Sequence, residues 1–245
     1  SLTRASLPKL ADLSSTNRQF YGCSSLERVE FSPNLKKVSG AVFYGCESLI
    51  TSDFIEGLTT ISDSAFAGCK SITSVSLLAL ENAPKNLFQD CTSLESVVLP
   101  VSMRTIPAHM FDGCTSLKNV QFPTGVVTIS DYAFANCGFE GDVELPVSVL
   151  SIGKGAFVGC NSMNLIIDEN SAAFNMDENG LVTDNMGNVV FVPADYSGQI
   201  TLSADMVYAN EVLSGCYGIT SVVIADGITE IPAYAFAGLK GISSI

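Results

Sequence analysis

The sequence contains no tryptophan, a single histidine and only 12 basic residues, set against 25 acidic ones. The net charge is −13, which opposes binding to phosphate-rich partners because such surfaces need clustered Lys and Arg. We therefore expect neither nucleic acid nor an anionic membrane as a partner. No apolar run approaches the roughly 20 residues of a transmembrane helix, so we expect no membrane insertion.

Eight cysteines recur along the 245 residues with nearly constant spacing. They lie at positions 23, 46, 69, 91, 114, 137, 160 and 216, and steps of 22 or 23 residues separate the first seven. A fixed period of this size is typical of a solenoid. A phenylalanine precedes each of the first seven cysteines by three residues, from Phe20 to Phe157, so half of the 14 phenylalanines occupy one column.

Apolar residues also follow each cysteine at regular positions, three, six and eight residues later. In the repeat that begins at Cys91 they are Leu94, Val97 and Leu99. The last two positions alternate as in a short strand, and Pro100 then ends it because proline has no N–H to donate. A second apolar pair and a polar turn follow, and we expect one short helical turn there to carry the Phe.

The pattern resembles a leucine-rich repeat, and the run Ala65-Phe66-Ala67-Gly68-Cys69 is similar to the BspA-like class of bacterial and protist surface proteins. The unit from Ile228 to Leu239 looks like an ordinary extracellular leucine-rich repeat, with Leu239 at the cysteine position. The resemblance implies an α/β solenoid: a right-handed superhelix of about nine turns, with short parallel strands on the concave face and short helical turns or irregular segments on the convex face. Residues 1–245 would form one domain.

One stretch departs from the period, because 33 residues more than one repeat separate Cys160 from Cys216. It contains two β-rich runs, residues 181–183 and 189–193, joined by a turn rich in Asn and Gly. Such a pattern predicts a β-hairpin. We expect it to be an insertion at about residues 168–202 inside one repeat.

The cysteine column permits three interpretations. Neighbouring strands lie close enough for disulfides, but equivalent residues of stacked repeats have parallel Cβ vectors, which is the wrong geometry for a bridge. Zinc is disfavoured because no two cysteines are close in sequence and no histidine lies near them. We expect buried, reduced thiols that fill the core, no metal site and no cofactor.

His109 is the only imidazole, and its place before Phe111 predicts a solvated turn residue rather than a general base. Asp168, Glu169, Asp177, Glu178 and Asp184 suggest calcium, but Gly180 comes too early for an EF-hand, so turn chemistry explains them. No combination of nucleophile, base and oxyanion donors is present. We expect no catalytic residues and no enzymatic activity.

Residues five and seven positions after each cysteine flank the inward strand residue, so they are expected on the exposed face of the sheet. At one end of the array, Leu165, Ile167 and Val223 would form an apolar group beside the hairpin, either an interaction site or, as we expect, a group that the inserted segment covers. The other members are the candidate partner-binding residues: Arg28, Glu30, Thr51, Asp53, Ser74, Ser76, Ser96, Val98, Asn119, Gln121, Asp142 and Glu144.

The resemblance implies an extracellular or cell-surface, adhesin-like module that binds a host-matrix or microbial surface protein through its concave face. The alternatives are a carbohydrate-binding surface protein or a non-catalytic carrier domain of a larger protein. Ile242 and Ile245 would start a further strand at an open end of the stack. This predicts either a fragment of a longer chain or a monomer in equilibrium with a weak dimer.

Overall fold

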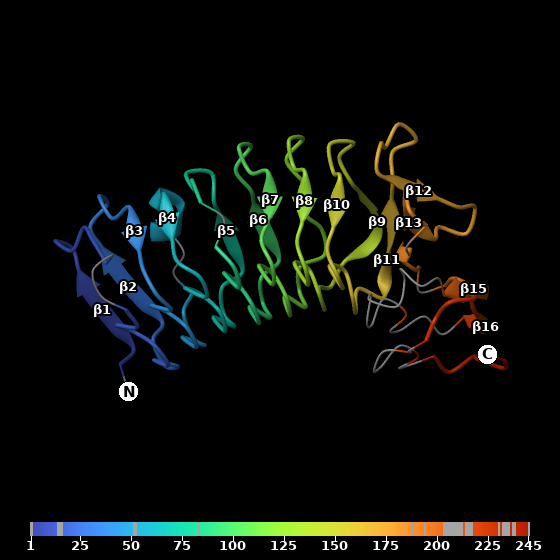
Figure 1. The fold of residues 1–245 in the computed structure, drawn as a ribbon. Coiled ribbons are helices and arrows are strands. Elements are labelled where there is room, and N and C mark those ends of the chain that lie inside the picture. The colour runs from blue at the N-terminus through green and yellow to red at the C-terminus, as the bar shows by residue number, and fades with distance from the viewer. Residues whose placement is uncertain are drawn as a thin grey trace.

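The protein is a solenoid of about nine stacked coils in this computed structural model, arranged side by side along a gently arched axis (Figure 1). The structure describes residues 2–13, 17–50, 53–82, 84–187, 189–193, 195–202, 213, 218–229, 231, 236 and 239–244. Across these residues we found no helix long and apolar enough to cross a membrane. The right-handed winding of the coils stays a prediction.

A first ladder is built from the longer strands that follow the cysteines. All of its pairs are parallel and join residues about one repeat apart, as a solenoid requires. The pairs are β1 (Arg4–Leu7) with β2 (Arg28–Phe31), β5 (Ser74–Ser76) with β6 (Ser96–Val98), β9 (Glu140–Glu144) with β11 (Ser162–Ile166), and β15 (Gly198–Leu202) with β16 (Ile219–Ile224).

A second ladder consists of two-residue strands formed by the second apolar pair of each repeat. Its pairs are also parallel, and each contains an inward isoleucine or valine. They are β3 (Lys37–Val38) with β4 (Thr60–Ile61), and β7 (Thr105–Ile106) with β8 (Thr128–Ile129), which pairs in turn with β10 (Ser151–Ile152).

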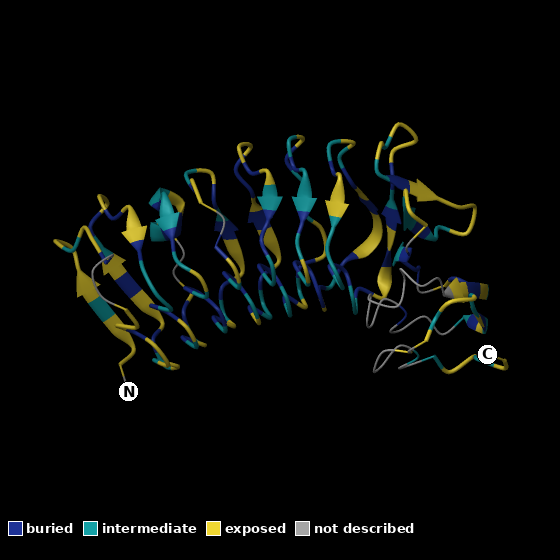
Figure 2. Cartoon of the chain, viewed as in Figure 1, coloured by how far each residue is buried: buried dark blue, intermediate teal, exposed yellow. Residues whose placement is uncertain are grey.

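The core is a continuous column between the two ladders, and buried residues line the inside of the stack (Figure 2). Its centre is the phenylalanine column, in which successive rings from Phe20 to Phe157 are stacked with centroids 5.3–6.0 Å apart. Phe43, Phe66, Phe88, Phe111 and Phe134 are fully buried. The period of the sequence therefore produces one uninterrupted aromatic stack.

The turns that carry the phenylalanines are not helical, contrary to the expectation of short helical turns. In most coils the residues five and one positions before the cysteine have positive φ, for example His109 (54°) and Gly113 (79°) around Cys114. Left-handed residues cannot continue a right-handed helix. They allow turn N–H groups to donate to the next coil instead, as Phe111 does to Ala133 (2.9 Å) and Gly113 does to Ala135 (2.8 Å).

One coil replaces its strand with a helical element. The pattern after Cys46 predicts a strand through Asp53, but the structure has a 3-10 helix, η1 (Asp53–Gly57). Ile55 takes the inward position there, and the Phe54 ring contacts Phe31 edge-on with centroids 5.1 Å apart. Within the described ranges η1 is the only helix.

The segment after β11 forms an antiparallel sheet of β12 (Phe174–Met176), β13 (Val182–Asp184) and β14 (Val189–Phe191). Side chains of Phe174, Val182 and Phe191 belong to the main core, whereas Val189 packs in a second, smaller core with β15 and β16. The sheet thus lies between two cores. Whether it is an insertion within one repeat stays a prediction.

Candidate functional site

The residues five and seven positions after each cysteine, here called the strand face, alternate with buried residues as expected. Val75, Val97 and Val143 are buried. Ser76 is half-buried, and Thr51 lies outside the described residues. The other candidate partner-binding residues are exposed: Arg28, Glu30, Asp53, Ser74, Ser96, Val98, Asn119, Gln121, Asp142 and Glu144. That a partner binds here, and that this face is the concave one, stay predictions.

Leu165 and Ile167 are buried, at 1% and 9% exposed, in agreement with a covered group, but the expectation that they project from the strand face is wrong. The register explains the error, because Leu165 pairs with the inward Val143. The strand after Cys160 is therefore one residue out of step with its neighbour. A one-residue shift exchanges the two faces of a strand, so the constant count from cysteine fails at this coil.

A hollow of about 490 Å³ lies on the strand face between β6 and residues 119–124. No strand pairing joins these two segments, although β6 pairs with β5 on its other side. Leu78, Val98 and Val101 are exposed around the hollow, at 62%, 49% and 86%. Its polar side chains carry hydroxyl or amide groups, and no charged residue lines it. We call it the apolar hollow.

A second hollow, of about 570 Å³, occupies the equivalent place between β2 and η1. On its other side β2 pairs with β1. Three exposed carboxylates, Glu30, Asp53 and Glu56, line it without any basic residue. We call it the acidic hollow.

Both hollows contain a half-buried phenylalanine eight residues after a cysteine. The acidic hollow contains Phe31 and Phe54, and the apolar hollow contains Phe122. Coils with leucine at this position bury it, as Leu77 and Leu99 show. The change from leucine to phenylalanine was visible in the sequence, but the strand pattern alone did not mark it as a site.

Polar contacts between neighbouring coils run along the strand face. Ser6 Oγ donates to Glu30 Oε2 at 2.8 Å, and Asn164 Nδ2 donates to Asp142 Oδ1 at 3.1 Å. These groups are exposed, so each contact contributes little to stability. They do orient the two acidic side chains at opposite ends of the face.

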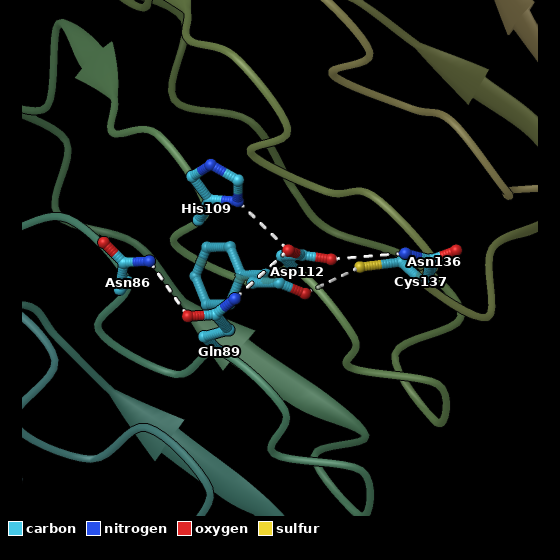
Figure 3. A network of polar contacts seen from close by, with 7 residues as sticks. Asn86, Gln89, His109, Asp112, Asn136 and Cys137 are labelled. Atoms are coloured by element: carbon cyan, nitrogen blue, oxygen red, sulfur yellow. Dashed lines mark hydrogen bonds and ion pairs between the residues drawn. The ribbon is translucent and has the colours of Figure 1, made fainter. Parts of the chain in front are cut away.

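His109 lies in a turn, as the sequence predicts, and its side chain is 36% exposed, but the imidazole also contacts neighbouring side chains. Its Nδ1 lies 3.0 Å from Asp112 Oδ2 (Figure 3). Its ring stacks on Tyr132 with centroids 5.0 Å apart. Asp112 also accepts hydrogen bonds from the amides of Gln89 and Asn136, both at 3.3 Å. The cluster joins three neighbouring coils at their turns and contains no nucleophile beside the imidazole.

The described cysteines, 23 through 160, are free thiols, and all except the half-buried Cys23 are buried. Each buried thiol donates a hydrogen bond to the carbonyl of the phenylalanine in the preceding coil, for example Cys114 Sγ to Phe88 O at 3.2 Å. Desolvation by burial raises the pKa of Cys91 to about 12 and raises that of Cys114 well above its usual value. The core-filling interpretation is confirmed for these thiols, and Cys216 lies outside the described residues.

The acidic turns after β11 bind their own backbone. Asp177 Oδ1 accepts from the N–H groups of Asn179 and Leu181, both at 2.9 Å, and Asp184 Oδ1 accepts from Met186 N–H. Asp168 accepts from the backbone and side chain of Asn170, which lowers the pKa of its carboxyl. In the part of the chain that the structure describes, no three His, Cys, Asp or Glu side chains are placed to hold a metal ion.

Comparison with protein families gives one clear match. A model described as the BspA type leucine rich repeat region matches six copies, over residues 6–82, 81–176 and 185–245. No protein with a curated description matches the sequence significantly.

Solved structures give the same result for the fold. A leucine rich cell surface protein from Faecalibacterium prausnitzii superimposes with a TM-score of 0.65 at 18% identity, covering 99% of this chain and 68% of that one. The T. pallidum leucine rich repeat protein is 30% identical, with a TM-score of 0.55 over 65% of this chain and 77% of that one. The pneumococcal vaccine antigen PcpA has a TM-score of 0.54 at 16% identity, over 98% of this chain and 59% of that one.

Proposed function

Because the chain belongs to the BspA-type leucine-rich repeat family, we propose that it is a protein-binding scaffold whose strand face holds the partner. The observation that carries the proposal is the apolar hollow: exposed leucine and valine side chains are grouped in the middle of a face that is otherwise polar. Grouped apolar side chains of this kind mark interaction sites. The chain has no catalytic activity of its own in this proposal.

We further propose that the module acts outside the cell or at its surface, in an adhesin-like role. The similar F. prausnitzii structure is described as a cell surface protein, which supports this location. The net charge of −13 favours a neutral or basic partner, because acidic residues at the ends of the face repel negative surfaces. A host-matrix or microbial surface protein satisfies both conditions.

The experiment uses three substitutions on exposed residues of the strand face, Ser74→Arg, Ser96→Arg and Asn119→Arg together. A matched control places three arginines on the exposed residues that directly follow cysteines, Ser24, Thr115 and Asn161. Both proteins gain the same charge, so non-specific electrostatic effects are equal. Binding to immobilised matrix proteins and to intact bacterial cells should collapse only in the first variant.

Glycan arrays run with the same two proteins address the carbohydrate-binding alternative. If the first triple variant still binds glycans selectively, the protein is a carbohydrate-binding protein whose site lies elsewhere on the molecule, and the proposal is wrong. Full protein binding by the first variant would also overturn it.

A further inference from the structure

We propose that the two hollows of the strand face form a pair that takes one extended segment of the partner, with a basic side chain in the acidic hollow and an aliphatic side chain in the apolar hollow. The inference rests on the proposed function, since it names the chemistry of what that face binds. It is carried by the equivalent positions of the hollows, their different linings and their separation along the stack.

The hollows are equivalent because each lies between a strand of the first ladder and a phenylalanine eight residues after the next cysteine. One follows β2 and the other follows β6. In a parallel ladder the N–H and C=O groups of alternate residues point to opposite sides. Ser96 and Val98 use theirs toward β5, for example when Val98 O accepts from Leu77 N–H at 2.8 Å. Val97 therefore directs its backbone groups toward residues 119–124, with which it forms no strand pair.

The acidic hollow selects a cation. Its three carboxylates are exposed, and the ammonium of Lys36 donates to the carbonyl of Gly57, another residue of the lining, at 3.1 Å. The rings of Phe31 and Phe54 form its half-buried wall. A guanidinium combines charge with a planar face that packs on aromatic rings, so arginine suits this hollow better than lysine.

The apolar hollow selects a neutral aliphatic group. Val98, Val101 and Leu78 surround it and Phe122 lines it, so a charged side chain would lose hydration without gaining a partner. Asn119 and Gln121 add amide groups at its edge, which suits the peptide groups that flank an anchor.

The separation of the hollows sets the spacing of the two anchors. Three coil steps separate them, and successive phenylalanine rings in this part of the stack lie 5.3–6.0 Å apart. The distance is therefore about 17 Å, which an extended chain spans with about five residues at 3.3 Å each. Side chains of a strand alternate, so both anchors reach the surface only when an even number of positions separates them. Spacings of four and six residues satisfy the alternation, and their lengths of about 13 and 20 Å bracket the distance between the hollows.

The test uses fluorescein-labelled synthetic peptides with capped ends, one Arg, one Leu and Ser or Thr elsewhere. Leucine is placed four, five or six positions after the arginine, so composition and charge are constant. Fluorescence anisotropy should show the four- or six-residue spacing binding at least about tenfold more tightly than the five-residue spacing, a difference of about 1.4 kcal/mol. Equal binding by all three peptides, or no binding by any, would overturn the paired-anchor inference.

Variants of the protein assign each anchor to its hollow. One double variant, Glu30→Lys with Asp53→Lys, should abolish the salt-dependent part of peptide binding. The matched control replaces two exposed carboxylates outside the face, Glu169→Lys with Glu178→Lys. Val98→Asp should weaken binding of the peptide that contains leucine. The same substitution should leave unchanged the weaker binding of a control peptide in which Ser replaces that leucine. Loss of binding in the control pair would show that net charge alone drives it.

The result is separable from the proposed function. If the peptides fail while the triple arginine variant still abolishes partner binding, the strand face remains the site and only the paired-anchor inference is wrong. If the peptides bind with the expected spacing while partner binding survives the triple variant, the hollows are real sites that the partner does not use.

Discussion

Two regions of the molecule use the same strand pairing but differ in how their cores are made. In the regular array, residues 20–160, stacked phenylalanines and inter-coil thiol contacts run through one core. In the C-terminal region, residues 189–244, β15 and β16 pair in parallel like β9 and β11, yet they enclose a separate cluster around Ile200, Ile219 and Val222. Strand pairing therefore continues beyond the antiparallel sheet, whereas among the described residues the stack of phenylalanine rings ends at Phe157.

The antiparallel sheet between the two regions serves both. Phe191 of β14 packs in the main core, and Val189 of the same strand packs in the second. The comparison indicates that the sheet terminates one core and starts another. Coupling between the regions should then depend on a few side chains rather than on a continuous stack.

The largest effect is expected from breaking the aromatic stack. Phe111→Ala removes a fully buried ring between Phe88 and Phe134, and should lower the free energy of unfolding by about 3–5 kcal/mol. Urea denaturation followed by circular dichroism measures this loss. Ile200→Ala, in the second core, should leave amide-exchange protection around Phe111 unchanged, and a loss of protection there would show that the two cores are one cooperative unit.

The next largest loss of stability should come from substituting, one at a time, the two residues of β14 that pack in different cores. Phe191→Ala should cost about 3 kcal/mol and increase amide exchange in β11 and β13. Val189→Ala should cost about 2 kcal/mol or less and increase exchange in β15 and β16. Hydrogen exchange with mass spectrometry resolves these segments, and identical exchange patterns for the two variants would refute the partition.

The thiols of the array predict an alkaline limit to stability. Burial raises the pKa of Cys91 from 9.0 to about 12, so the unfolded chain loses this proton at lower pH than the folded protein. The stabilisation is fully present below pH 9 and is lost as pH rises toward 12, by at most about 1.4 kcal/mol per pH unit and thiol. Denaturation series at pH 8 and pH 10 should show a smaller decrease for Cys91→Ala than for the native sequence. An equal decrease would mean that other groups govern the alkaline transition.

The smallest effect concerns the left-handed turns of the array. Asn136 has a φ of 55° and donates to Asp112, so Asn136→Gly relaxes the backbone while removing one exposed hydrogen bond. The net change should stay within about 1 kcal/mol. Asn136→Ala keeps the strained φ without the bond and should be less stable than the glycine variant, as thermal melts of the pair can show.

The sequence predicted the repeat and its core because the period recorded the same environment many times. Phe66, Cys69 and Val75 each occupy the position that spacing assigned to them, and all are buried. The family was predicted from the same motif and is confirmed. These inferences required only one coil to be understood, since the stack repeats it.

Errors arose where a single coil departs from the template. The 3-10 helix at Asp53 and the register shift at Leu165 occur once each, so periodicity contains no information about them. The helical conformation predicted for the turns was wrong for a different reason. His109 and Asn136 are ordinary L-residues in left-handed conformations, which composition signals less clearly than glycine does. The apolar hollow was missed because it depends on a strand pair that β6 does not form with residues 119–124, and the acidic hollow because η1 lines it.

The thiol contacts give the stack a polarity. Cys46, Cys69 and the later buried cysteines all donate to the coil before them, and each phenylalanine carbonyl that accepts also binds the cysteine N–H of its own coil, as Phe43 O does with Cys46 N–H. Between such neighbouring coils, the later coil thus donates one thiol hydrogen bond, and the phenylalanine carbonyl of the earlier coil accepts it. The thiol donor of one coil therefore matches the carbonyl acceptor of any coil placed before it. Deleting or duplicating a whole coil leaves no thiol–carbonyl hydrogen bond unmatched. The length of the array can therefore change in whole coils while these hydrogen bonds between neighbours are kept.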